Sequence, residues 1–181
     1  MHRCRRILVT SLLVAALAVS GFAAPSTASA KLTRLSTMSL VESSYAVTIL
    51  NTINAQRVKH RLKKVRFSLV LTVAALRHNV AMGRVNQISH QLPGERDFVA
   101  RGRAAGWRAK CASGENIGVN ARMDRAGAVE LQNLMYNERP PYDGHRRNIL
   151  NSRYTHVGIG ITLDLRNKRL WLTTDFAQYR C

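Results

Sequence analysis

The chain has 181 residues, of which 46% are hydrophobic, and a formal net charge of +18. This composition excludes a collagen-like chain, a disordered polypeptide and a multi-span membrane protein, and the length suits one domain with its own core. Three cysteines are too few for a small scaffold that depends on many disulfides.

The first 30 residues have the organisation of a secretory signal peptide. Three arginines within residues 1–6 precede an apolar stretch at 7–24, and Ala28-Ser29-Ala30 has the small-x-small form of a cleavage site. An uncleaved anchor is the alternative, because about 18 apolar residues are near the minimum that spans a bilayer. We favour cleavage after Ala30, since this ending has no role in an anchor. The expected product is secreted, extracellular or envelope-associated, and has no transmembrane segment.

The mature chain would keep two cysteines, Cys111 and Cys181. Outside the cytoplasm an even pair predicts one disulfide, and two free thiols are the alternative. The bond would close a loop of about 70 residues and stabilise the fold by roughly 4 kcal/mol on the loop-entropy model.

The positive charge predicts attraction to anionic partners. Cleavage would remove three arginines and no acidic residue, which leaves +15. Such an excess favours an anionic envelope polymer or lipid surface, and the alternative is a solvated basic face with no dedicated partner. Nucleic acid is not favoured, because export removes the protein from the genome and no aromatic residues interleave with the cations. The densest cluster is Arg57, Lys59, Arg61, Lys63, Lys64 and Arg66.

The N-terminal half of the mature chain predicts helices. Residues 31–42 are expected to form a loose arm, after which Ser43 or Ser44 would cap a first helix. A second helix over residues 68–85 has two apolar stripes and is expected to be largely buried. A short helix is predicted over residues 97–105. The stripe of the first helix is Ala46, Ile49, Leu50 and Ile53.

The C-terminal half predicts one more helix and then a β-hairpin. Asp124 would cap a helix that ends near Asn137, before two prolines, with Leu131, Leu134, Met135 and Glu138 as its inward stripe. Two strands are predicted, over 157–163 and 170–176. In the first, Gly158 and Gly160 would leave one face bare for close packing. Helices followed by an antiparallel hairpin predict an α+β fold whose helices cover a sheet.

Glu138 and His145 are the first candidates for chemistry. Glu138 ends an apolar stripe, where a carboxylate needs a cation, hydrogen bonds or a metal. The Pro-Pro-Tyr-Asp-Gly segment between them could return the chain and bring His145 beside it. Such a pair could ligate a metal or work as acid and base, and a structural hydrogen bond is the alternative.

Several ordered motifs resemble the CAP superfamily, also called the SCP domain. They span residues 46–177 and include Ser89-His90, Gly114-Glu115-Asn116-Ile117-Gly118, Gly144-His145-Arg146-Arg147-Asn148-Ile149-Leu150, Thr155-His156-Val157-Gly158-Ile159-Gly160 and Trp171-Leu172-Thr173-Thr174-Asp175-Phe176. The resemblance implies a CAP domain over residues 43–181 and a three-layer α-β-α sandwich. It departs from the family at Tyr136, where a Trp is frequent, and at Thr174-Asp175, where a Gln is common.

The resemblance also implies a cleft with two histidines and two glutamates. By motif these are His90, Glu115, Glu138 and His145. In relatives this cleft can hold a divalent ion, for which His90 and His145 would be the metal ligands and zinc the expected metal. The glutamates could orient the imidazoles or accept a proton from bound water.

The remaining histidines carry different expectations. His78 lies on a buried helical stripe and is expected to be a core residue bonded to backbone rather than a ligand. His156 is expected to be structural and His60 solvated.

We favour a binding or interaction module over an enzyme, because no nucleophile of a standard type accompanies the cleft. The alternatives are a peptidase-like hydrolase assisted by the metal or the carboxylates, and a sterol- or lipid-binding protein. The family resemblance alone does not choose among them.

Overall fold

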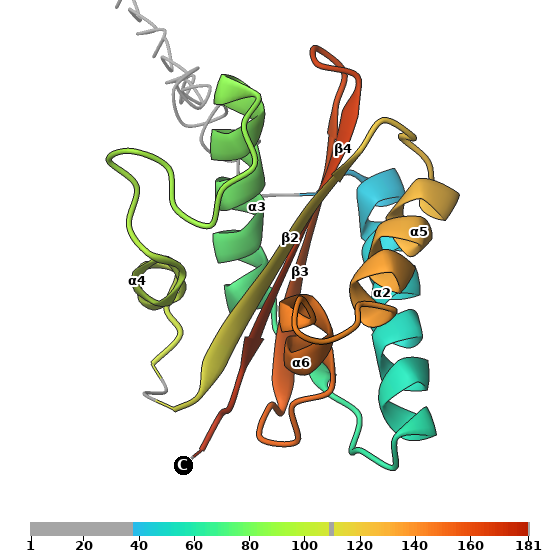
Figure 1. Ribbon diagram of the computed structural model, residues 1–181. Coiled ribbons are helices and arrows are strands. Elements are labelled where there is room, and N and C mark those ends of the chain that lie inside the picture. The colour runs from blue at the N-terminus through green and yellow to red at the C-terminus, as the bar shows by residue number, and fades with distance from the viewer. Residues whose placement is uncertain (1–37, 109–110, 181) are drawn as a thin grey trace, which may run out of the picture.

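The computed structural model describes residues 38–108 and 111–180, where one sheet lies between two layers of helices (Figure 1). α3 and α4 cover one face, and α2, α5 and α6 lie on the other. This confirms the predicted α+β fold and its α-β-α layering. The elements are α2 Leu40–Lys59, β1 Arg66–Phe67, α3 Leu69–Val85, α4 Phe98–Ala104, β2 Ser113–Asn120, α5 Arg125–Tyr136, α6 Gly144–Ile149, β3 His156–Asp164 and β4 Arg169–Ala177.

Three predictions concern parts of the chain outside the described residues. The signal peptide lies there completely, as does the arm up to residue 37. Cys181 also lies there, so its disulfide with Cys111 stays a prediction.

The sheet has the order β1-β3-β4-β2. β3 and β4 form the predicted antiparallel hairpin, β2 runs antiparallel to β4, and the two-residue β1 runs parallel to β3. β2 therefore forms one edge. The sequence analysis missed β2, since its Gly- and Asn-containing sequence has weak β-propensity, and its strand geometry comes from pairing with β4.

Of the two predicted helix caps, the one at Asp124 is confirmed, since its side chain caps α5. Ser68 and Asp97, at which two of the predicted helices begin, cap α3 and α4. The predicted cap at Ser43 or Ser44 is wrong, because Ser39 and Glu42 form a capping box that starts α2 at Leu40. The last three residues of the predicted arm are thus the first turn of α2.

The inward stripe predicted for α5 is only partly correct. Leu131 and Met135 are buried, but the side chain of Leu134 points outward and is 61% exposed. Glu138 follows the C-cap residue Asn137, so the chain after the helix, and not its apolar stripe, positions this carboxylate.

The bare face of β3 packs tightly on α3, as predicted. A Cβ atom on Gly160 would come within 2.9 Å of the backbone of α3 at Ala75 and Leu76, and one on Gly158 would overlap Leu71 and Thr72. The two glycines therefore set the close approach of α3 to the sheet.

Arg57 differs from the other members of the densest basic cluster in the sequence. Its side chain is fully buried, and the burial lowers the pKa of its guanidinium. The guanidinium donates to the carbonyl oxygens of Lys63, Ile149, Asn151 and Tyr154, at 2.7–3.3 Å. Arg57 thus ties the end of α2 to the segment between α6 and β3, while the other five members of the cluster remain exposed.

Across residues 38–108 and 111–180, no helix combines the length and apolar character needed to cross a bilayer.

We expect Arg57→Met to lower the free energy of unfolding by about 3 kcal/mol, because it leaves buried carbonyl oxygens without a donor. Urea unfolding followed by circular dichroism measures this change. Lys59→Met, at an exposed site in the same helix, is the control and should change it by less than about 0.5 kcal/mol. Equal effects of the two variants would contradict the structural role of Arg57.

Candidate functional site

All four residues predicted for the cleft line one pocket of about 380 Å³. Tyr142, Gly144 and Asn148 complete its lining. The four come from separate segments: His90 from the loop between α3 and α4, Glu115 from β2, Glu138 from the loop after α5, and His145 from α6. The volume is in the range of small-ligand sites, which is about 300–1,000 Å³.

The first histidine–glutamate pair joins an exposed ring to a buried carboxylate. His90 Nδ1 lies 2.8 Å from Glu115 Oε1, and the two side chains are 57% and 1% exposed. Arg101 of α4 donates to the other oxygen of Glu115 and to the carbonyl oxygen of His90, so one guanidinium holds both partners.

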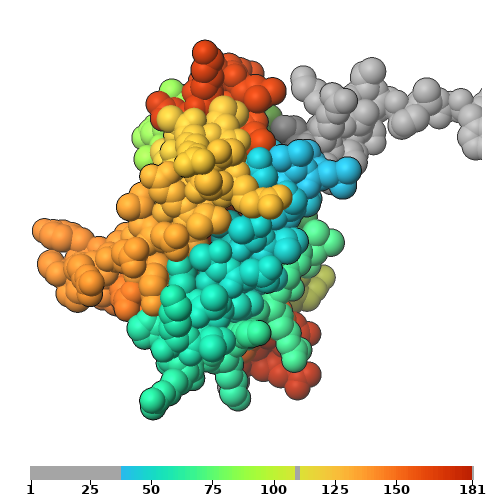
Figure 2. Space-filling model, turned by 90° about the vertical axis from the view of Figure 1, so that its right-hand side faces the viewer, coloured from blue at the N-terminus to red at the C-terminus, as the bar shows by residue number. Residues whose placement is uncertain are grey.

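The second pair is local in sequence. His145 Nδ1 lies 2.5 Å from Glu138 Oε1, and the backbone N–H of His145 donates to Glu138 Oε2 at 2.9 Å. The predicted return of the chain through the two prolines is therefore confirmed. Figure 2 shows α2 and α5 side by side, with the segment that follows α5 projecting from this face.

Two asparagines join the pairs across the edge of the sheet. Asn116 of β2 donates to the carbonyl oxygen of His145, and Asn148 of α6 donates to Asn116 Oδ1 at 2.8 Å and to the carbonyl oxygen of Glu115 at 3.2 Å. α6 is thereby fixed to β2. The sequence analysis quoted both asparagines in its motifs but gave them no role.

The carboxylates determine which ring nitrogen of each histidine is available. An ionised carboxylate only accepts hydrogen bonds, so each Nδ1 carries a proton, and in the neutral imidazole the lone pair is on Nε2. Histidines that bind metals are oriented in the same way, with the second ring nitrogen bonded to a carboxylate. The donor set therefore suits an ion held by two imidazoles, with the glutamates as orienting groups.

No group of three or more His, Cys, Asp or Glu side chains in the described parts of the chain is placed to hold a metal. Typical catalytic zinc sites have three protein ligands. An ion here would take most of its ligands from water or from a bound molecule.

Glu115 belongs to a charged network that continues away from the pocket. Its burial raises the pKa, but the hydrogen bond from His90 and the charges of Arg101 and His78 outweigh this, so the pKa is below the usual value. His78 is fully buried, as predicted, but its Nδ1 bonds the carboxylate of Glu95 at 2.8 Å and not the backbone. The prediction of its partner was therefore wrong.

Asp175 is the residue that sequence reasoning missed. It lies directly opposite Glu115 in the β2–β4 register, is 3% exposed, and neither of its oxygens has a hydrogen-bond partner within the described structure. Burial, followed by the negative charge of Glu115, raises its pKa well above the usual value. The two facing acids therefore differ in acidity, since the pKa of Asp175 is raised and that of Glu115 is lowered. Its departure from the family's usual Gln was the available signal.

The other histidines lie outside this pocket. His60 is exposed, but its Nε2 lies 2.9 Å from the hydroxyl of Tyr136. His156 is half-buried and packs against Trp107 and Tyr179.

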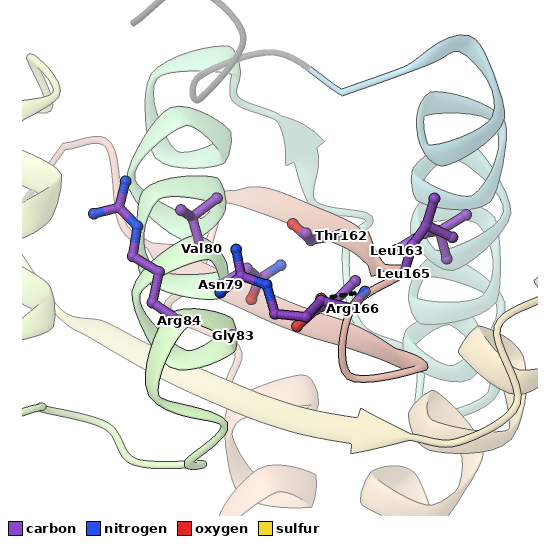
Figure 3. A pocket seen from close by; sticks show the side chains of 9 residues that line it. Asn79, Val80, Gly83, Arg84, Thr162, Leu163, Leu165 and Arg166 are labelled. Carbon is purple, nitrogen blue, oxygen red and sulfur yellow. Dashed lines mark hydrogen bonds between the residues drawn. The ribbon is translucent and has the colours of Figure 1, made fainter. Parts of the chain in front are cut away.

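A larger cavity of about 560 Å³ lies elsewhere, between α3 and the turn of the β3–β4 hairpin (Figure 3). Arg166 extends from the hairpin toward α3, and Arg84 and Asn79 lie on the helix side. The sequence analysis predicted no site there.

Asp175→Asn is expected to gain stability relative to the wild type as the pH rises. The native wild type retains a proton on Asp175 that the unfolded chain releases near pH 3.9, so its unfolding free energy falls above that pH by about 1.4 kcal/mol per unit, until Asp175 ionises in the native state. The asparagine variant lacks this slope. Urea unfolding between pH 4 and 8 tests it, and parallel curves for the two proteins would contradict a protonated Asp175.

Comparisons with known proteins identify relatives of this chain in sequence and in fold. The family model for the cysteine-rich secretory protein family, CAP, matches residues 50–176. The uncharacterised protein YkwD of Bacillus subtilis (strain 168) is 32% identical over 137 residues, which are 76% of this chain and 49% of that protein. The chain thus spans about half of this curated relative.

Solved structures agree on the fold. An extracellular SCP-domain protein of Bacillus anthracis matches with a TM-score of 0.64 and 24% identity, over 76% of this chain and 41% of that one. An outer surface protein of Borrelia burgdorferi matches with a TM-score of 0.62 and 15% identity, over 75% of this chain and 92% of that one. The fold, the sequence match and the assembled motifs agree, and the chain belongs to the cysteine-rich secretory protein (CAP) family.

Proposed function

We propose that this protein is a secreted CAP-domain interaction module whose His/Glu pocket binds a divalent ion or a small polar ligand. The observation that carries the proposal is the orientation of the two imidazole rings. His90 and His145 each present Nδ1 to a glutamate, so both Nε2 atoms are left for a ligand in the same pocket.

A divalent ion, with zinc the expected one, would be held by the Nε2 atoms of His90 and His145. When bound, it would act as a Lewis acid for an oxygen ligand in its remaining positions. Glu115 and Glu138 would keep the rings in one orientation. Arg101 would in turn hold Glu115 and the backbone of His90.

A peptidase-like hydrolase is the second candidate. The His145–Glu138 pair favours it, because its side chains are 32% and 23% exposed and have the hydrogen bond of a general base with its orienting acid. We favour the binding module, since no standard nucleophile accompanies the pocket.

The sterol- or lipid-binding alternative has less support. The apolar pocket beside Asp175, lined in part by Phe98, Trp107 and Phe176, measures about 140 Å³. This is below the range of about 300–1,000 Å³ typical of ligand pockets.

The proposed location outside the cell or at its envelope rests on two arguments. The N-terminal 30 residues have the pattern of a signal peptide. The similar proteins of B. anthracis and B. burgdorferi are described as an extracellular protein and an outer surface protein.

Zinc titration of the purified mature protein tests the pocket. We expect the His90→Ala/His145→Ala variant to lose the binding seen for the wild type, because it removes both nitrogen ligands. Glu115→Gln and Glu138→Gln should each weaken binding by about 10- to 100-fold, because each removes the carboxylate that orients one imidazole. Isothermal calorimetry measures all four proteins.

His60→Ala is the control, since it removes an exposed histidine outside the pocket. Unchanged zinc affinity in the double variant would end the metal proposal. Hydrolysis of peptide or ester substrates by the wild type that disappears in Glu138→Gln, with folding intact, would replace the binding module by the hydrolase.

A further inference from the structure

Another hollow, separate from the pockets described above, lies beside β1, at the edge of the sheet away from β2. It measures about 540 Å³ and is formed by three segments, which gather at the lower end of the molecule in Figure 1. We call it the basic groove. Its lining is Lys63, Lys64, Arg66, Ser152, Tyr154, Thr155, His156, Tyr179 and Arg180.

The basic groove carries uncompensated positive charge. Four lysine and arginine side chains line it, no carboxylate does, and none of the four forms an ion pair within residues 38–108 and 111–180. By contrast, the exposed Arg122 and Arg147 are paired with Asp124 and Asp143. Burial and then the charge of Arg66 lower the pKa of His156.

The walls of the groove are held by interactions beneath them. Arg57 donates to the carbonyl oxygens of Lys63, on one wall, and of Asn151 and Tyr154, on the other. The Tyr154 ring stacks on Phe176 at 5.7 Å between centroids. This preorganisation reduces the entropy that a ligand would lose in ordering the site.

Two aromatic residues of the lining, His156 and Tyr179, belong to a ring cluster. Trp107, His156 and Tyr179 pack together with centroid separations of 5.3–5.8 Å. The Arg180 guanidinium lies over the Tyr179 ring at 5.9 Å, so one cation is held against this cluster.

We propose that the basic groove binds a linear phosphodiester polymer of the cell envelope. A row of cations in a hollow suits a chain with repeated phosphates, whereas a flat bilayer would meet a projecting surface more fully. Lysine offers a point charge to a phosphate and arginine a planar pair of donors. The choice of an envelope polymer over nucleic acid rests on the proposed extracellular location. The proposal for the basic groove does not depend on metal binding in the His/Glu pocket.

Binding of a fluorescent poly(glycerol phosphate) oligomer to the mature protein, measured by anisotropy, tests the proposal. With about four phosphate contacts and a slope of about −0.7 each, affinity should fall roughly 50-fold between 50 and 200 mM salt. Lys63→Ala/Lys64→Ala/Arg66→Ala should weaken binding at least about tenfold and reduce the salt slope by about 2.

The control variant is Arg77→Ala/Arg84→Ala/Arg166→Ala, which removes the same charge from exposed sites on α3 and the hairpin. It should stay within about threefold of the wild type at a fixed salt concentration, because it spares the groove. An equal loss in both triple variants would overturn the proposal, since binding would then follow net charge alone.

The occupant is tested with three more probes: vesicles with phosphatidylglycerol, a single-stranded oligonucleotide and inorganic phosphate. The proposal requires the polymer to bind most tightly at equal phosphate concentration. Tighter binding of vesicles or of the oligonucleotide would overturn it in favour of a membrane or a nucleic acid.

A measurement on the wild type tests the proposal without relying on the folding of the variants. The pKa of His156, followed by NMR, should rise when the polymer binds, because phosphates offset the charge of Arg66. An unchanged pKa would contradict binding in the groove. The zinc titration does not involve these residues, so the two proposals can fail separately.

Discussion

The charge of Glu115 is the constraint around which the site is arranged. A carboxylate that is 1% exposed on an edge strand can stay ionised only if cations and donors replace water. Arg101 and His90 supply them from the loop and helix beyond α3, and this requirement draws His90 to the strand. Asp175 lies directly opposite, and its burial together with the negative charge of Glu115 raises the pKa of its carboxyl well above the usual value. One buried negative charge therefore accounts for the contacts of Arg101 and His90 and contributes to the raised pKa of Asp175.

The segment from α6 to the start of β3 connects the His/Glu pocket and the basic groove. Its first residues, with His145 and Asn148, line the His/Glu pocket, and its last, with Tyr154 and His156, line the basic groove. Asn116 and Arg57 hold the two ends of this segment through its backbone carbonyl oxygens. A ligand in one hollow therefore contacts the same rigid piece of chain as a ligand in the other. The two sites are separate in chemistry but share their support.

Membership of the CAP family accounts for the sandwich and the cleft residues without assigning a reaction. The fold is a scaffold, and a function has to be argued from the groups at the site. Here the paired imidazoles and carboxylates face an open pocket, which favours ligand or ion binding. The matched region is also only about half of the curated relative, so the activity of that whole protein does not transfer to this chain.

Local patterns in the sequence determined much of this protein. Apolar periodicity and capping residues located α3, α4, α5 and the β3–β4 hairpin, and the ordered motifs named the four cleft residues. Only the tertiary structure decided the rest. β2 is a strand because β4 pairs with it, Arg57 is buried because four distant carbonyl oxygens surround it, and the pKa of Asp175 is raised because it is buried opposite Glu115. Each depends on neighbours far away in sequence, and local patterns carry no information about such contacts.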